Sequence, residues 1–170
     1  MEQNFIILLR LLHIFFGVFW AGALFYMSMF ILPASNAIPE GGKFMQQLAR
    51  TNRLPVVMML AATISILSGI LLMWKLYDFN STWMGSDMGM LFSTGGAFAV
   101  IAYLIGFMVN MPTVAKISSI GKSVAVSGGT PTPEQIQTMN KLRGKLSSAI
   151  RITAILIAAS VICMSVARYV

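Results

Sequence analysis

The chain has little charge and few of the residues that build active sites in soluble proteins. Of its 170 residues, 10% are charged and only five are acidic, whereas soluble domains contain about 25% charged residues. It has a single histidine. It also has a single cysteine, so it has no disulfide framework. No acid–base pair, nucleophile–base pair or nucleotide-binding loop is recognisable, which argues against a hydrolase or a kinase.

Apolar residues make up 57% of the chain and gather in four long stretches. Each stretch is close to the ~20 residues that cross ~30 Å of hydrocarbon. We therefore predict an all-α fold, an integral membrane four-helix bundle that forms one domain over residues 1–170. A cleaved signal peptide is not expected, because the first stretch is too long and is interrupted by Arg10 and His13. The predicted spans are about 5–32, 55–74, 89–111 and 149–170, and the third is expected to stop near Pro112, because proline usually ends a helix.

The basic residues are distributed unevenly between the two sides of the predicted bundle. Positively charged loops stay in the cytoplasm, so the charge indicates topology and no nucleic-acid partner is expected. We predict cytoplasmic basic loops and outside termini, in a membrane of the bacterial inner-membrane type, with the lipid bilayer as a partner. Nine basic residues lie in two loops and their flanks, the loop between spans one and two and the loop between spans three and four: Lys43, Arg50, Arg53, Lys116, Lys122, Lys141, Arg143, Lys145 and Arg151. The opposite side holds three: Arg10, Lys75 and Arg168.

The cytoplasmic loops are predicted to contain short amphipathic helices. In the segment 41–54, Phe44 and Leu48 stand at helical spacing among basic residues, which predicts an interfacial helix that leads into the second span. Thr132 followed by Pro133 has the pattern of a helix start, with a capping hydroxyl and a proline at the first position. We expect this second helix to run directly into the fourth span.

The only histidine, His13, lies inside the first span. An ionisable group inside a bilayer is costly and is therefore a functional candidate, and imidazole is a common ligand of metals and haem. Arg10, Gly17 and Trp20 lie three residues before, four after and seven after His13, so all four share one helix face. On that face Gly17 would leave room for a flat ring bound to the imidazole.

Methionine is unusually frequent, with 14 residues. Most are scattered through the spans, but Met84, Met88 and Met90 cluster at the predicted outer end of span three, on the same side as His13. Thioethers suit Cu(I) and can serve as the sixth ligand of a haem iron. If span three packs on span one, these methionines could meet His13. Alternatively, they line the rim of the bundle.

Other residues of the spans predict how the helices pack. Gly17 and Ala21 in span one, and Ser65 and Gly69 in span two, are small residues four apart, which lets helices approach closely in lipid. Span three carries two polar groups, Tyr103 and Asn110. We expect these to form hydrogen bonds between helices, because lipid offers them no partner.

The first span resembles that of the HemJ-type protoporphyrinogen oxidases, with His13, Trp20 seven residues later and Tyr26 six beyond that. It is also similar to the CopD copper-resistance domain. The segment 68–72, followed by Trp74, is similar to the glycine-centred second span of the same superfamily. The resemblance implies a membrane bundle of four or five helices. For the HemJ type it also implies a haem b on the first-span histidine, a role that His13 would inherit.

Two features of that family have no counterpart in this chain. The family has a functional lysine near the start of span three, whereas residues 89–111 contain none. The Leu-Pro-Arg segment that follows the family's first-span tyrosine is replaced by residues 27–29, Met-Ser-Met. If the protein is an enzyme, a HemJ-like oxidoreductase is the expected class, but the sequence leaves enzymatic activity open.

Three functional hypotheses follow from the sequence. In the first, the protein binds haem b for redox chemistry or electron transfer, with His13 as axial ligand, Arg10 near a propionate, and Gly17 and Trp20 framing the ring. In the second, it handles Cu(I) through His13 and the three outer methionines. In the third, it is a cofactor-free structural or accessory subunit of a larger membrane complex, and His13 and Arg10 bond only to their neighbours. A homo-oligomer or a larger membrane complex is expected in each case.

Overall fold

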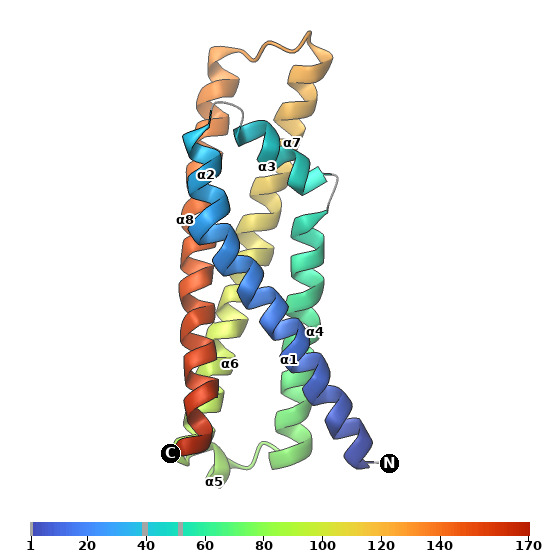
Figure 1. Ribbon diagram of the computed structural model, residues 1–170, viewed down its shortest axis with the longest axis vertical. Coiled ribbons are helices and arrows are strands. Elements are labelled where there is room, and N and C mark those ends of the chain that lie inside the picture. Colours follow the sequence, from blue (N-terminus) through green and yellow to red (C-terminus); the bar gives the residue numbers. More distant parts are fainter. Residues whose placement is uncertain (1, 39–40, 51–52) are drawn as a thin grey trace.

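The computed structural model describes residues 2–38, 41–50 and 53–170, and every regular element in these ranges is a helix. Four helical segments are long and apolar enough to cross a membrane, which confirms the predicted all-α membrane bundle (Figure 1). They are each somewhat longer than the spans expected from the sequence. They comprise Glu2–Ala37, Leu54–Tyr77, Asp87–Val126 and Pro133–Tyr169.

The first and third segments each contain one π-helical turn between two α-helices. The first consists of α1 (Glu2–Tyr26), η1 (Met27–Ile31) and α2 (Leu32–Ala37). The third consists of α6 (Asp87–Ile105), η2 (Gly106–Asn110) and α7 (Met111–Val126). The second segment is α4 (Leu54–Tyr77), and the fourth is α8 (Pro133–Val166) followed by the short η3 (Ala167–Tyr169).

A proline explains each π turn. Pro33 and Pro112 each stand two residues after the end of a π turn. A proline ring inside a helix lacks an N–H donor and clashes with the carbonyl group four residues earlier. One wider turn with hydrogen bonds to the fifth preceding residue lets the helix continue. The sequence-based expectation that the third span stops near Pro112 was therefore wrong, because the helix widens there and continues to Val126.

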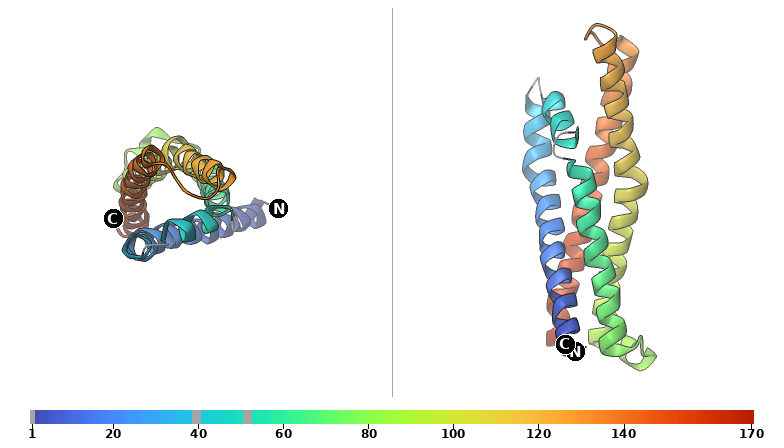
Figure 2. Two further views of the ribbon diagram at one scale, coloured as in Figure 1. Left: turned by 90° about the horizontal axis from the view of Figure 1, so that it is seen from above. Right: turned by 90° about the vertical axis from the view of Figure 1, so that its right-hand side faces the viewer.

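The fourth segment begins where the sequence predicted a helix start. Thr132 Oγ1 accepts a hydrogen bond from the Gln135 backbone N–H at 3.2 Å, and Gln135 Oε1 accepts one from the Thr132 N–H at 2.9 Å. This capping box satisfies two backbone donors at once. From there α8 continues for 34 residues, about 50 Å, which confirms that the loop helix runs into the span. The hairpin of α7 and α8 therefore extends beyond the other helices (Figure 2).

Both chain ends lie at one end of the bundle, together with the short helix α5 (Ser81–Met84) (Figure 1). The helix α3 (Gly41–Arg50) and the connection between α7 and α8 lie at the other end. The two basic loops thus share one end, as the charge pattern predicted. Helix α3 also matches the amphipathic helix expected in the first of these loops.

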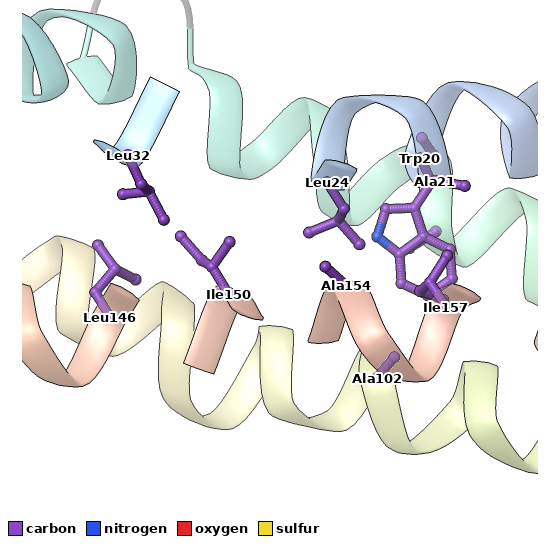
Figure 3. Packing of buried hydrophobic residues seen from close by; sticks show 11 residues of the cluster. Trp20, Ala21, Leu24, Leu32, Ala102, Leu146, Ile150, Ala154 and Ile157 are labelled. Atoms are coloured by element: carbon purple, nitrogen blue, oxygen red, sulfur yellow. The ribbon is translucent and has the colours of Figure 1, made fainter. Parts of the chain in front are cut away.

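The helices associate mainly in two pairs, α1 with α4 and α6 with α8, and α8 also contacts α1. Small residues of α4, such as Ala61 and Ala62, are fully enclosed where the helices meet. Trp20 of α1 lies toward Ala154 and Ile157 of α8 in the centre of the bundle (Figure 3). Many large apolar side chains instead face outward, as expected for helices surrounded by lipid.

Candidate functional site

His13 lies where α1 crosses α4. Its Nδ1 atom is 2.8 Å from the Ser65 backbone oxygen, and the Ser65 hydroxyl donates a hydrogen bond to the His13 backbone oxygen at 3.2 Å. The imidazole packs directly on Gly69, because a Cβ atom at that position would lie 2.8 Å from both Cε1 and Nδ1. These contacts between His13 on α1 and Ser65 and Gly69 on α4 hold the two helices together where they cross.

The hydrogen bond to Ser65 defines the protonation of the neutral imidazole. A carbonyl oxygen only accepts hydrogen bonds, so Nδ1 of His13 carries the proton and Nε2 keeps its lone pair. Among the described residues, none forms a hydrogen bond with Nε2. A histidine whose Nδ1–H is held by a carbonyl group has the arrangement found in metal-ligating histidines.

The other three residues predicted to share a helix face with His13 have different surroundings. Gly17 packs on α4, since a Cβ atom there would lie 3.1 Å from the Ser65 hydroxyl, so α4 occupies the space that was expected to receive a flat ring. Arg10 is exposed. Trp20 is buried and points toward α8 (Figure 3). The structure thus brings His13 and Gly17 together on α4 and separates Trp20 from them.

The outer methionines surround the turn between α5 and α6. Met84 ends α5, and Met88 and Met90 stand in the first turn of α6. Trp83 of α5 stacks on Tyr77 at the end of α4, with ring centroids 3.7 Å apart, which holds α5 against α4. The sequence hypothesis required span three to pack on span one, but α6 packs mainly on α8.

The surroundings of His13 add no further metal ligand. Its polar contacts are with α4, the main neighbour of α1. Within the ranges that the structure describes, no three His, Cys, Asp or Glu side chains come together as a metal site. A joint site of His13 and the methionines therefore stays a prediction.

A cavity of about 640 Å³ occupies the half of the bundle nearer to α3. Its lining changes along its length. The deep end is formed by buried side chains, including Trp20, Ala102 and Thr153. The mouth carries exposed polar groups of Asn140 and Arg143. His13 does not line this cavity, so the structure contains two separate candidate sites.

Both π turns contribute to the cavity wall, Met27 from η1 and Gly106 and Asn110 from η2. The Asn110 Oδ1 atom is buried and has no hydrogen-bond partner among the described residues. Tyr103, by contrast, accepts a hydrogen bond from Thr63 of α4 at 3.1 Å, which confirms the expected interhelical bond for this residue. An unsatisfied acceptor next to a cavity is costly unless a ligand or water satisfies it.

Helix α3 covers the cavity at the end of the bundle. Met45, Leu48 and Ala49 line it from this side, whereas Phe44 points outward with 46% of its surface exposed. The start of α3 packs so closely on α2 that a Cβ atom at Gly41 would overlap the Ser35 carbonyl oxygen. The cavity is therefore covered on this side by a helix that is held in place by contact with the α2 backbone.

Sequence reasoning did not find this cavity. Asn110 was recognised only as a polar group in need of a partner, and Pro112 only as the end of a span. Two prolines that follow the apolar part of spans one and three, at Pro33 and Pro112, are the signal that could have indicated widened helices. Ser65 and Gly69 were recognised as packing residues, but their partner His13 follows only from the helix pairing.

The chain was also compared with known proteins. No protein-family description, no curated protein and no solved structure matches it. The resemblance of the first span to the HemJ-type oxidases and the CopD domain therefore stays a prediction. The structure is that of a membrane protein with four helical spans, a histidine where α1 crosses α4, and a separate cavity near α3.

Proposed function

We propose that this membrane protein binds haem b through Nε2 of His13 and uses it for redox chemistry or electron transfer. The observation that carries the proposal is the 2.8 Å contact between Nδ1 of His13 and the Ser65 carbonyl oxygen. It orients the ring and leaves the lone pair of Nε2 for an iron ion. The resemblance of the first span to that of the HemJ-type oxidases supports the same role for His13.

The chain supplies the following groups for this role. His13 would hold the iron, and Arg10, one turn earlier on α1, would pair with a propionate at the membrane surface. Gly69 lets the imidazole pack directly on α4. The bound haem supplies a reversible one-electron change at iron. Because His13 does not line the cavity near α3, lipid or a second copy of the chain would have to cover the haem.

A second function is favoured by a different observation. His13 and Ser65 exchange two hydrogen bonds across the α1–α4 crossing, and such bonds between membrane helices stabilise their pairing. In a cofactor-free accessory subunit these bonds would be the whole role of His13. The two functions make different predictions for substitutions at the two residues.

The His13→Ala variant is expected to lose the Soret absorption band of haem completely. The Ser65→Ala variant is expected to keep it, because the acceptor for Nδ1 is a backbone carbonyl that the substitution leaves in place. Loss of the Ser65 hydroxyl should cost only about 1 kcal/mol in stability. The measurements are the absorption spectrum and thermal unfolding of protein purified gently from haem-replete membranes.

Three results decide between the candidate functions. If wild-type protein shows no Soret band and contains no metal, the haem proposal is wrong and the accessory-subunit function gains support. If copper co-purifies instead, and is lost when Met84, Met88 and Met90 are all replaced by Leu, the protein handles Cu(I). If both single variants retain haem, His13 is not the ligand.

We also propose that the end of the bundle with α3 faces the cytoplasm, because that end carries both basic loops. A cysteine at Ser127, in the connection between α7 and α8, should then be protected from an impermeant thiol reagent in intact cells. A cysteine at Ser81, at the start of α5, should react. Labelling at Ser127 with protection at Ser81 would reverse the orientation. The native Cys163, with Ser127 and Ser81 unchanged, serves as the control.

A further inference from the structure

The cavity under α3 has the size and the polarity gradient of a binding site. Its volume of about 640 Å³ lies within the range of natural ligand pockets, roughly 300–1,000 Å³. The deep end is apolar, with Trp20 and Leu24 of α1 buried against α8 (Figure 3). The mouth is polar, with Asn36, Asn140 and Arg143 exposed. A ligand that matches both ends is amphipathic, with its apolar chain inside.

The charge at this end of the bundle favours an anionic headgroup. Nine of the chain's 12 basic residues belong to the two loops at this end and their flanks, but only two of its five acidic residues do. At the mouth itself, the Arg143 guanidinium lies against Gly42 at the start of α3. Arginine binds carboxylate and phosphate groups through paired hydrogen bonds.

The position of Arg143 along α8 agrees with an anionic headgroup at the mouth of the cavity. It lies six residues before Ala149, the predicted start of the fourth span, and therefore about 9 Å beyond the hydrocarbon. Headgroup layers extend several ångströms beyond the hydrocarbon on each side. A long, flexible arginine side chain at that height can reach this layer.

A polar atom inside the cavity also lacks a partner. The Asn110 Oδ1 atom, in the π turn η2, is buried without a hydrogen bond in the described part of the chain. The other π turn, η1, contributes Met27 to the cavity wall. Single π turns in α-helices occur frequently at functional sites, where they reshape the helix surface.

From these observations we infer that the cavity binds a single-chain amphiphile with an anionic headgroup. The carboxylate or phosphate group lies at the mouth beside Arg143, and the apolar chain extends past Asn110 toward Trp20. Asn110 would accept a hydrogen bond from a hydroxyl group of the ligand or from a water bound with it. Helix α3 covers the bound molecule. This inference is independent of haem at His13, which does not line the cavity.

Photo-crosslinking to the full chain in detergent tests the inference. The probes are a fatty acid and a lysophosphatidic acid, each with a diazirine near the end of the chain, and the matching fatty alcohol. Mass spectrometry should find the label from an anionic probe on peptides that contain the deep residues Trp20, Leu24 or Ala102. The corresponding unlabelled lipid should compete. If only one anionic probe labels these peptides, it identifies the headgroup as a carboxylate or a phosphate.

Two variants with matched controls test the two ends of the site. Gly144 lines the cavity, and a Cβ atom there meets nothing within 4 Å, so Gly144→Phe should fill the mouth and abolish labelling of the deep peptides. Gly22 of α1 has equally open surroundings away from the cavity, so Gly22→Phe should leave labelling unchanged.

At the headgroup, Arg143→Gln should weaken labelling by the anionic probes by about three- to tenfold, because it removes a charged donor. Lys145→Gln, on the same helix but outside the cavity lining, should have no effect. Equal labelling by the alcohol and the acids would overturn the anionic headgroup. Equal labelling of Gly144→Phe and Gly22→Phe, or label confined to outward-facing residues such as Phe15, would overturn the site itself.

Discussion

Alanine at Gly41 is expected to release α3 from α2 and uncover the cavity. A Cβ atom at this position overlaps the backbone carbonyl of Ser35, and a carbonyl inside a helix cannot move without displacing α2. Forced overlap of this kind typically costs 1–3 kcal/mol. Amide hydrogen exchange in α3 should therefore accelerate about tenfold or more, while exchange in α4 and α8 stays close to that of wild type.

The neighbouring glycine provides the control. A Cβ atom at Gly42 would overlap the Arg143 guanidinium, which is the far end of a flexible side chain and can swing away. Alanine also has a higher helix propensity than glycine by up to about 1 kcal/mol. Gly42→Ala should therefore leave exchange in α3 unchanged or slow it. Equally fast exchange in both variants would mean that contact with Ser35 does not hold α3.

The second large effect is expected for Gly69→Ala. The new methyl group would lie 2.8 Å from two atoms of the His13 ring, so the ring would have to move. Movement breaks the hydrogen bond between Nδ1 and the Ser65 carbonyl and separates α1 from α4. We expect a loss of roughly 1–3 kcal/mol in stability, together with several-fold lower haem occupancy if Nε2 holds the iron.

Gly96→Ala is the matched control for this variant. Gly96 lies in the middle of α6, and a Cβ atom there meets nothing within 4 Å. Its alanine variant should keep or slightly raise the thermal unfolding temperature, because alanine favours the helix. The measurement is thermal unfolding of both purified variants in the same detergent. If the two unfold at the same temperature, the contact between Gly69 and His13 does not stabilise the bundle.

The features predicted correctly from the sequence depend on local chemistry. The spans follow from long apolar runs, and the start of α8 follows from Thr132 and Pro133. The position of both basic loops at one end follows from counting the spans between them. Two spans separate the loops, so the chain returns to the same end of the bundle. None of these predictions requires knowledge of which helices touch.

The features that were missed depend on pairing between distant segments. His13 was recognised as unusual, but its partners Ser65 and Gly69 are more than 50 residues away and follow only from the packing of α1 on α4. The same holds for the cavity, whose wall comes from α1, α2, α3, α4, α6, α7 and α8 as well as both π turns. Pro112 was interpreted as a stop because proline usually ends a helix, and the alternative of a widened turn depends on neighbouring helices that can satisfy the freed backbone groups.

The two π turns give each of their spans two rotational phases. One extra residue in a turn rotates everything that follows by about 100° about the helix axis. In the third span, positions before Gly106 and after Asn110 therefore follow two different helical wheels. A single wheel drawn through Asp87–Val126 would assign the wrong face to one half of the span. Deleting one residue from η2 would turn α7, with its basic residues Lys116 and Lys122, by the same angle relative to α6.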